Sequence, residues 1–267
     1  MGILNVTPDS FSDGGNFIEL DDALSQAQRM ISEGADIIDV GGESTRPGAE
    51  PVSEQQEIDR VVPVIEAIAS RFDVVVSLDS SKAAVMREAA SVGAGMLNDV
   101  RALQEPLAVE VAAQTGLPVC LMHMQGQPGT MQKAPYYKDV TAEVIEFLVH
   151  RRNVCVAAGI SAGQIVLDPG FGFGKTLSHN LSLLNELDQL CVEAPVLIGL
   201  SRKRMLGAIL GDNSADRVTA SVTAALLCVQ RGASIVRVHD VEPTVHALAV
   251  HWTALEAAVE QNGAGNG

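Results

Sequence analysis

Short apolar runs alternate with amphipathic segments from one end of the chain to the other. The apolar runs have the length of buried strands, and the segments between them repeat apolar residues at helical spacing. The predicted strands are residues 2–6, 36–40, 74–78, 95–98, 118–122, 164–168, 195–199 and 234–238. The predicted helices lie near residues 21–33, 53–70, 82–92, 106–115, 139–158, 178–190, 214–231 and 241–260.

This alternation predicts the fold class. Eight strands and eight helices in about 260 residues have the size and rhythm of a single (β/α)8 TIM barrel, an α/β fold. A doubly wound sheet also alternates, but it usually has fewer strands, and the GxGxxG fingerprint that follows its first strand is absent here. We expect one barrel domain over residues 1–260 and a disordered tail over residues 261–267.

Composition and charge narrow the function classes. Hydrophobic residues make up 47% of the chain, yet no stretch has the roughly 18 to 20 charge-free apolar residues of a membrane span. The formal net charge of −15 opposes binding to nucleic acids and anionic membranes, so clusters of Lys and Arg are informative. No signal peptide is visible, and the four scattered cysteines form no CxxC pair, so we expect a cytoplasmic protein with free thiols.

Nearly every predicted strand ends in an amide, an acid or a cation. In a TIM barrel these positions lie on one rim, where the loops that follow the strands build the active site. The residues at these ends are Asn5, Asp39, Asp79, Asn98, Asp99, Met122, His123, Asp168, Ser201, Arg202, Lys203, Arg237, His239 and Asp240. A carboxylate beside an apolar run costs stability unless it is paired, so we expect these side chains to form one site.

The chemistry of these groups favours a ligand with two different ends. Asp79, Asn98 and Asp168 offer several hydrogen-bond acceptors and an amide donor, which suits a flat heterocycle rich in N–H groups, such as a pterin or a purine. Lys203 and Arg237 follow the last two strands, where TIM barrels commonly bind phosphate. The sequence therefore predicts a site for a nitrogen heterocycle on one side and an anion on the other.

Two loops carry further signals. Residues 7–15 are polar and glycine-rich but include Phe11, a pattern typical of a lid over a site. The segment GFGFGKT, residues 170–176, resembles a phosphate-binding P-loop, but Pro169 stands where the motif requires its first glycine. We interpret this segment as a turn that brings the backbone close to the ligand, with Phe173 as an apolar wall. The histidines show no metal-ligand spacing.

Long motifs of the chain resemble those of dihydropteroate synthase, the bacterial folate enzyme that sulfonamides inhibit. They are MGILNVTPDSFSDGG, EGADIIDVGGESTRPGA, VSLDSSK, LNDVRAL, LDPGFGFGK, SRK and RVHD, in the order of the family. The resemblance spans Met1 to about Leu255. It implies a TIM barrel that condenses 6-hydroxymethyl-7,8-dihydropterin diphosphate with 4-aminobenzoate, giving 7,8-dihydropteroate and pyrophosphate.

The resemblance also implies roles for individual residues. The pterin ring would be held by Asp79, Asn98, Asp168 and Lys203, and Arg237 would stack on it and reach the diphosphate. Asn5 and His239 would contact the diphosphate, Asn5 through Mg²⁺, the implied cofactor. The 4-aminobenzoate pocket would be formed by Thr45, Arg46, Pro47, Phe173 and Ser201. The implied catalytic residues are Asp79, Lys203, Arg237 and Asn5, and the implied assembly is a homodimer.

The implied chemistry is a dissociative displacement. Loss of pyrophosphate leaves a positively charged methylene carbon on the pterin ring, and nearby carboxylates, Asp79 above all, would favour that cation. The aniline nitrogen then attacks once it is positioned. Loops 7–17 and 43–52 would close over the reacting centre and exclude water.

Two other functions share part of this pattern. A methyltransferase barrel that binds pterins would use the same acids and amide, and a non-catalytic pterin-binding barrel would need ring recognition alone. Neither function requires Asn5, Arg46, Lys203 and Arg237 together, which favours the synthase. One departure from the family concerns the first strand: members usually carry a stretch before the first motif, so we expect this strand to be short and the barrel bottom uncovered.

Overall fold

Parallel strands form the centre of the molecule. The computed structural model describes residues 1–6, 16–44, 51–127 and 130–264. Six strands form one sheet in chain order: β1 (Gly2–Asn5), β2 (Ile37–Gly41), β3 (Val75–Asp79), β4 (Met96–Asp99), β5 (Val119–Met122) and β6 (Ile165–Asp168). The last two strands, β7 (Leu197–Ile198) and β8 (Ile235–Val236), form a separate parallel pair.

Two isolated bridges join this pair to the sheet. Leu167 bridges Val196 on the β6 side, and Gly2 bridges Val238 on the β1 side. The second seam also has a backbone hydrogen bond from the Ile3 amide to the Val238 carbonyl, at 3.0 Å. The strands therefore close into the predicted (β/α)8 barrel, with a short seam on each side of the β7–β8 pair.

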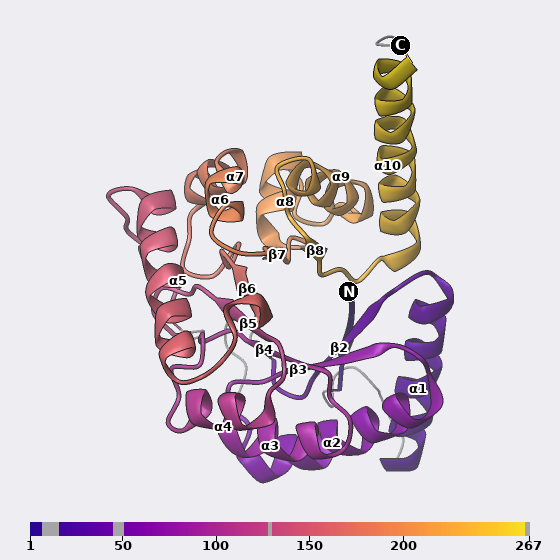
Figure 1. Cartoon of the computed structure of the whole chain (residues 1–267), viewed down its shortest axis with the longest axis vertical. Helices are drawn as coiled ribbons and strands as arrows, with labels where there is room; N and C mark the ends of the chain where they lie inside the picture. The colour runs from indigo at the N-terminus through magenta and orange to yellow at the C-terminus, as the bar shows by residue number, and fades with distance from the viewer. Residues whose placement is uncertain (7–15, 45–50, 128–129, 265–267) are drawn as a thin grey trace.

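Helices surround the ring of strands (Figure 1). They are α1 (Asn16–Ser32), α2 (Glu54–Arg71), α3 (Ala83–Ser91), α4 (Ala108–Thr115), α5 (Val140–Ala157), α6 (Leu177–Asn185), α7 (Leu187–Cys191), α8 (Arg204–Leu210), α9 (Val218–Val229) and α10 (Val241–Ala264). A 3-10 turn, Ala162–Gln164, precedes β6. Figure 1 shows α10 extending away from the ring. Within the described residues, no helix is long and apolar enough to cross a bilayer.

Several helices differ from the prediction, and the first of them, α1, begins at Asn16 rather than 21. The predicted helix at 178–190 is two helices, because Glu186 leaves the helical conformation at φ −111° and ψ 19°. The apolar segment after Lys203 forms α8, which the periodicity misses because the helix is only 7 residues long. Helix α9 begins at Val218 rather than 214. Helix α10 continues to Ala264, so residues 261–264 of the predicted tail are helical, and residues 265–267 lie outside the described part.

The core has two parts. A large cluster fills the space between the strands and the helices, with residues such as Leu78, Leu97 and Leu121 on the outer face of the strands. A small cluster of Met1, Met96, Cys120 and Leu197 belongs to the opposite, interior face of the barrel. The predicted short first strand is four residues long and pairs with neighbours on both edges. Beside it, the Met1 amino group donates to the Val236 carbonyl at 3.0 Å.

Candidate active site

Strand register brings the predicted acids and amide together. Asp79 is the partner of Asn98, and Asn98 is the partner of Cys120, which lies in the interior cluster. On the next pair of strands, Met122 is the partner of Asp168. Side chains alternate along each strand, so partners in register share a face of the sheet. Asp79, Asn98 and Asp168 therefore face the barrel interior at the carboxyl ends of their strands, as predicted.

The guanidinium of Arg237 joins two carboxylates at this rim. Its Nε lies 2.5 Å from Asp39 Oδ2, and its Nη2 lies 2.6 Å from Asp79 Oδ2. Asn98 Nδ2 donates to the same Asp39 oxygen at 3.1 Å. The Arg237 side chain is 20% exposed, and those of Asp39 and Asp79 are 0% and 17% exposed. Residues from β2, β3, β4 and β8 thus form one largely buried, charged network, which we call the carboxylate arc.

The carboxylate arc carries more negative than positive charge. Burial raises the pKa of Asp79 to about 7, with a further rise from Asp39, while Arg237 opposes it. Burial alone would lower the pKa of Arg237, but the two aspartates raise it well above its usual range. One guanidinium shared by two carboxylates cannot fully neutralise both, so a raised pKa at Asp79 is the expected consequence. Arg237 itself stays charged.

Asp39 is one of the strand-end residues predicted to form the site, and the structure gives it a specific role there. Its carboxylate is completely buried and bonds both Arg237 and Asn98. Among the described residues, its second oxygen, Oδ1, is buried without a hydrogen-bond partner. A buried acceptor without a donor is costly, so the charge of Asp39 is compensated through its other oxygen alone. The apolar run that precedes Asp39 is the sequence signal that predicts its burial at the strand end.

The opposite side of the rim, the lysine arc, consists of Asp168, Lys175, Lys203 and the loop of residues 170–174. Asp168 is buried, and its Oδ1 accepts from the Gly170 amide at 2.7 Å. Burial raises the pKa of Asp168, and the nearby Lys203 ammonium opposes that rise. Lys203 donates to the Phe171 carbonyl, and its Nζ lies 4.6 Å from the centre of the Phe173 ring. The predicted residues Asp168, Lys203 and Phe173 therefore meet here.

Burial also controls the charge of the lysine arc. It lowers the pKa of Lys203 to about 8, even though Asp168 opposes this shift. It lowers the pKa of Lys175 to about 7, with Asp168 again opposing and Lys203 adding to the decrease. Both ammonium groups have therefore lost much of their usual preference for the charged form.

Ser201 and His239 meet between the ends of β7 and β8. Ser201 Oγ accepts from the His239 amide at 3.1 Å and lies 3.0 Å from His239 Nδ1. The neighbouring Arg202 forms a two-point contact with Asp240, and its side chain is 53% exposed. Ser201 and His239 therefore lie at the predicted anion side, whereas Arg202 is committed to a surface pair.

Several predicted residues fall partly or wholly outside the described structure. Thr45, Arg46 and Pro47 lie outside the described residues, as does the predicted lid at 7–15 with Phe11. The stems on either side of residues 45–50 are tied together. Glu43 Oε1 accepts from the Val52 amide at 3.2 Å, and Lys82 Nζ contacts Glu43 at 2.6 Å and Glu57 at 2.5 Å. The described residues on either side of the 45–50 segment therefore meet beside one ion-pair cluster.

The largest difference from the sequence interpretation concerns Lys175. It belongs to the segment GFGFGKT, which was recognised and set aside as a P-loop look-alike. In a P-loop the lysine reaches a bound phosphate. Here its ammonium is buried against His123 and the carbonyls of its own loop. The prediction that this segment is not a P-loop is confirmed. The sequence interpretation gives no role to its lysine, which the structure buries beside the site.

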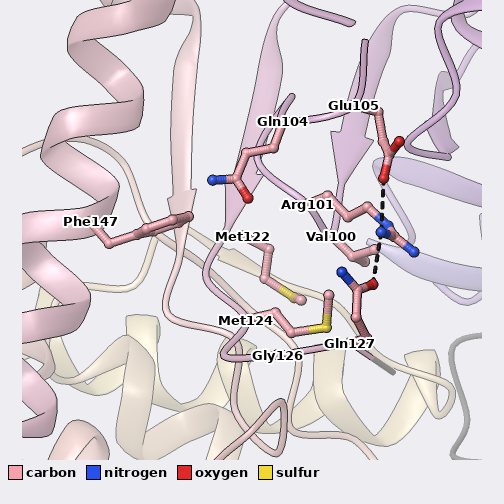
Figure 2. A pocket seen from close by; sticks show the side chains of 9 residues that line it. All are labelled: Val100, Arg101, Gln104, Glu105, Met122, Met124, Gly126, Gln127 and Phe147. Carbon is pink, nitrogen blue, oxygen red and sulfur yellow. Dashed lines mark hydrogen bonds and ion pairs between the residues drawn. The ribbon is translucent and has the colours of Figure 1, made fainter. Parts of the chain in front are cut away.

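A cavity of about 210 Å³ lies next to the site, between the loops that follow β4 and β5 (Figure 2). Figure 2 shows Phe147 of α5 facing Met122 and Gln104 across it, and Arg101 turned toward Glu105 and Gln127. Arg101 Nη1 contacts Glu105 at 2.8 Å and Gln127 at 3.0 Å. Met122 links the cavity to the site, because Asp168 is its partner in register. The cavity contains neither of the site cations, Lys203 and Arg237.

The chain matches a family model described as "Pterin binding enzyme" over residues 1–239. It is 57% identical over 255 residues to the dihydropteroate synthase of Haemophilus influenzae, covering 95% of this chain and 92% of that protein. A Yersinia pestis dihydropteroate synthase, solved with a sulfonamide drug complex, superposes with a TM-score of 0.90 at 57% identity, covering 96% of this chain and 93% of that one.

A third comparison concerns a structure with reaction product. The dihydropteroate synthase of Xanthomonas albilineans, solved in complex with 7,8-dihydropteroate, superposes with a TM-score of 0.86 at 46% identity, over 96% of this chain and 92% of that one. The comparisons favour the synthase over the methyltransferase and the non-catalytic barrel. The chain belongs to the dihydropteroate synthases, a family of transferases among the pterin binding enzymes.

Proposed function

We propose that the rim site joins 6-hydroxymethyl-7,8-dihydropterin diphosphate to 4-aminobenzoate and releases 7,8-dihydropteroate and pyrophosphate. The observation that carries the proposal is the arrangement of two arcs. Acceptors from Asp39, Asp79 and Asp168 face the same interior as the cations Arg237 and Lys203. Such a site matches a heterocycle rich in N–H groups that carries an anionic leaving group.

The pterin ring is proposed to lie between the two arcs. Asp79, Asn98 and Asp168 would accept from its N–H groups, and Lys203 would donate to a ring acceptor. Arg237 would stack on the ring, held in plane by Asp39 and Asp79. A planar guanidinium can stack and form hydrogen bonds at the same time, which an ammonium cannot. The 7,8-dihydropteroate bound by the Xanthomonas relative contains the same ring.

The diphosphate is proposed to lie toward the ends of β7 and β8. Arg237, His239 and Ser201 come from this side of the rim. Pyrophosphate leaves readily only when its growing charge is stabilised, and preorganised donors in a buried site provide that stabilisation. As it leaves, positive charge develops on the methylene carbon, and the Asp79 carboxylate would favour it. The amine of 4-aminobenzoate, which is largely neutral near pH 7, would then attack without a strong base.

Mg²⁺ is proposed as the cofactor, with Asn5 as its protein ligand. Asn5 is half-buried at the end of β1, and no described residue hydrogen-bonds to its side chain, so its oxygen is available. Within the described residues, no group of three or more His, Cys, Asp or Glu could hold a metal. One amide oxygen fits Mg²⁺, which keeps several waters and commonly binds through substrate phosphates. When bound, it would neutralise charge on the leaving pyrophosphate.

The second substrate is proposed to bind beside Phe173 and Ser201, with Thr45, Arg46 and Pro47 completing the pocket. Phe173 supplies an apolar wall next to Lys203. Ser201 lies between the strand ends that carry the cations. The described residues on either side of that segment are joined by the hydrogen bond from the Val52 amide to Glu43, which supports a pocket on this side of the rim.

A homodimer in a reducing cytoplasm is proposed for the assembled enzyme. Helix α10 packs on α9, but Val250, Trp252 and Leu255 farther along it are 72%, 51% and 45% exposed. Trp252 and Leu255, three residues apart, share one face of the helix, and an exposed apolar face favours a protein contact. The four cysteines are free, as thiols are in a reducing compartment. Light scattering should give twice the 28.0 kDa chain mass, and Trp252→Asp should shift it toward the monomer.

The deciding experiment is a turnover assay. The protein is incubated with the pterin diphosphate, 4-aminobenzoate and Mg²⁺, and 7,8-dihydropteroate and pyrophosphate are measured separately. Both products should appear in equal amounts, and EDTA should suppress them until Mg²⁺ is restored. A parallel assay with Lys133→Met, an exposed lysine outside the site, controls for surface charge. Absence of both products would overturn the proposal.

A further inference from the structure

The loop between β6 and α6, residues 170–174, is held by side chains at every carbonyl. Its carbonyls accept from Lys175 (Gly170 and Phe173), Lys203 (Phe171), Gln132 (Gly172) and Tyr137 (Gly174). The loop amides of Gly170 and Gly172 are also bonded, to side-chain oxygens of Asp168 and Asn180. A loop with so many fixed backbone groups holds one conformation.

Glycines make this conformation possible. Gly170 and Gly174 have φ of +65° and +61°, in the left-handed region. A Cβ at these positions would lie 1.9 Å from the His123 carbonyl oxygen and 2.4 Å from the Gln125 carbonyl oxygen. The loop therefore packs directly on the backbone after β5, without room for side chains.

Lys175 lies at the centre of this packing. Its side chain is almost fully buried, and Nζ lies 2.9 Å from His123 Nδ1, 3.0 Å from the Gly170 carbonyl and 3.1 Å from the Phe173 carbonyl. An ammonium has three N–H donors, and these three acceptors satisfy all of them. Lys175 therefore fastens both ends of the loop to the segment that follows β5.

His123 accepts from Lys175 in its neutral form. Burial lowers the pKa of His123 to about 3, and the Lys175 ammonium adds to the decrease. A neutral imidazole has one ring nitrogen that accepts, which here is Nδ1 facing Lys175. The backbone amide of His123 donates to the Asp168 carbonyl at 2.9 Å, so this contact connects Lys175 to the end of β6.

We propose that Lys175 is a positioning residue for the transferase reaction, because it fixes the loop that holds Lys203 beside Asp168. The same loop supplies the Phe171 carbonyl and the Phe173 ring that contact the Lys203 ammonium. Lys175 donates to the carbonyl of Phe173, the same residue whose ring contacts the Lys203 ammonium. The inference rests on the proposed role of Lys203 in binding the pterin ring.

The two lysines also interact through their charges. The Lys203 ammonium lowers the pKa of Lys175 to a value below that of Lys203, so Lys175 has lost most of its charge where Lys203 titrates. The other titratable groups around the pair are His123, Asp168, Tyr137, His179 and Arg237. Burial lowers the pKa of Lys203, so a loop displaced by the loss of Lys175 should let water reach the Lys203 ammonium and raise its pKa, whereas a loss of global stability alone would not.

Lys175→Met tests the proposal, because methionine keeps the apolar stem and removes the ammonium. Lys133→Met is the matched control, since it removes a lysine from the exposed part of the neighbouring β5–α5 loop. For both variants and the unmodified enzyme we would measure thermal unfolding, the affinity for 6-hydroxymethylpterin, and kcat/KM for the pterin diphosphate against pH.

Lys175→Met is expected to unfold cooperatively, bind 6-hydroxymethylpterin about tenfold more weakly and lose roughly 10- to 100-fold in kcat/KM, since small displacements of positioning groups have effects of this size. The alkaline limb of its kcat/KM profile should move to higher pH. Lys133→Met should match the unmodified enzyme. Affinity and turnover within twofold of the control, or a loss of turnover with an unmoved alkaline limb, would each overturn the proposal.

A second variant covers the case in which Lys175→Met does not fold. Lys175→Gln keeps two N–H donors without the charge, and the same three measurements apply to it. If neither variant folds, Lys175 serves stability alone and the proposal fails. Binding of 6-hydroxymethylpterin needs no turnover, so a failure of the proposed reaction in the unmodified enzyme is distinguishable from a failure of this inference.

Discussion

The two arcs of the rim bury positive charge in different ways. In the carboxylate arc, Arg237 is neutralised by two aspartates at 2.5 and 2.6 Å. In the lysine arc, Lys175 and Lys203 are surrounded mainly by backbone carbonyls, and Asp168 is the carboxylate that opposes the lowering of their pKa values. Carbonyl dipoles stabilise an ammonium less than an ionised carboxylate does, so burial dominates in the second arc.

This difference separates a permanent charge from adjustable ones. The pKa of Arg237 is raised far beyond any working pH, so its charge is constant. The pKa values of Lys203 and Lys175 are lowered to about 8 and about 7, so their charge changes within the physiological range. Among the acids, burial raises the pKa of Asp79 in the carboxylate arc to about 7. Each arc therefore contains a group that titrates near neutrality.

The largest effect is expected from Arg237→Gln, which should abolish turnover and lower the free energy of unfolding. Its loss leaves Asp39 and Asp79 buried without their shared cation, and breaking a buried ion pair from one side costs about 3–5 kcal/mol. Denaturant unfolding measures the cost. Adding Asp39→Asn to Arg237→Gln should recover part of the stability but no turnover. A variant as stable as the unmodified protein would show that the network is not a buried ion pair.

Lys203→Met should remove turnover with a smaller effect on stability. We expect a loss of roughly 100- to 1000-fold in kcat, because the ammonium is proposed to act on the bound pterin diphosphate in a buried site. Stability should change less than for Arg237→Gln, since no buried carboxylate pair loses its shared cation. Arg202→Met, one residue earlier, is the matched control. A comparable loss of kcat in both variants would contradict a specific role of Lys203 in the site.

Asp79→Asn should change the pH dependence of stability. The folded-state pKa of about 7 lies above the ordinary value of 3.8, so the folded state binds more protons between these values. This group therefore makes stability fall as pH rises through that window. The melting temperature of Asp79→Asn relative to the unmodified protein should increase from about pH 4.5 to about pH 8. A constant difference across this range would show that Asp79 has no raised pKa.

The smallest effect is expected from the pair formed by Arg202 and Asp240. Although its geometry is good, the arginine is half-exposed, and exposed ion pairs contribute about 0–1 kcal/mol. A double-mutant cycle with Arg202→Met and Asp240→Asn should give a coupling below about 1 kcal/mol that weakens with added salt. A coupling energy as large as the one measured in the same way for Arg237 and Asp39 would mean that burial does not determine the strength of these ion pairs.

Much of the fold was predictable because its signals are local. Apolar runs and helical spacing located the strands that end in Asp79, Asn98 and Asp168, and the rule that strand ends share one rim brought these residues together. Helix α8 and the break between α6 and α7 were missed because both involve short segments. In such segments, tertiary contacts outweigh the periodic pattern.

The site was less predictable where it depends on contacts across the barrel. Arg237 and Asp39 are 198 positions apart, and no local pattern shows which strand-end acid the guanidinium reaches. Lys175 was missed for a related reason. Its motif was compared with phosphate-binding loops, whereas its partners are backbone carbonyls and His123, which a sequence does not mark as acceptors for a lysine.

The two seams that close the barrel have a consequence for how the site opens. Lys203 and Arg237 follow β7 and β8, strands of two residues each, joined to the sheet by isolated bridges. Asp79 and Asn98 belong to strands of the continuous sheet. Regions with few backbone hydrogen bonds open at lower free energy than the rest of a domain. In native-state hydrogen exchange, amides at these seams should therefore exchange before those of β3 and β4, and warming should detach the cations from the acids before the barrel unfolds.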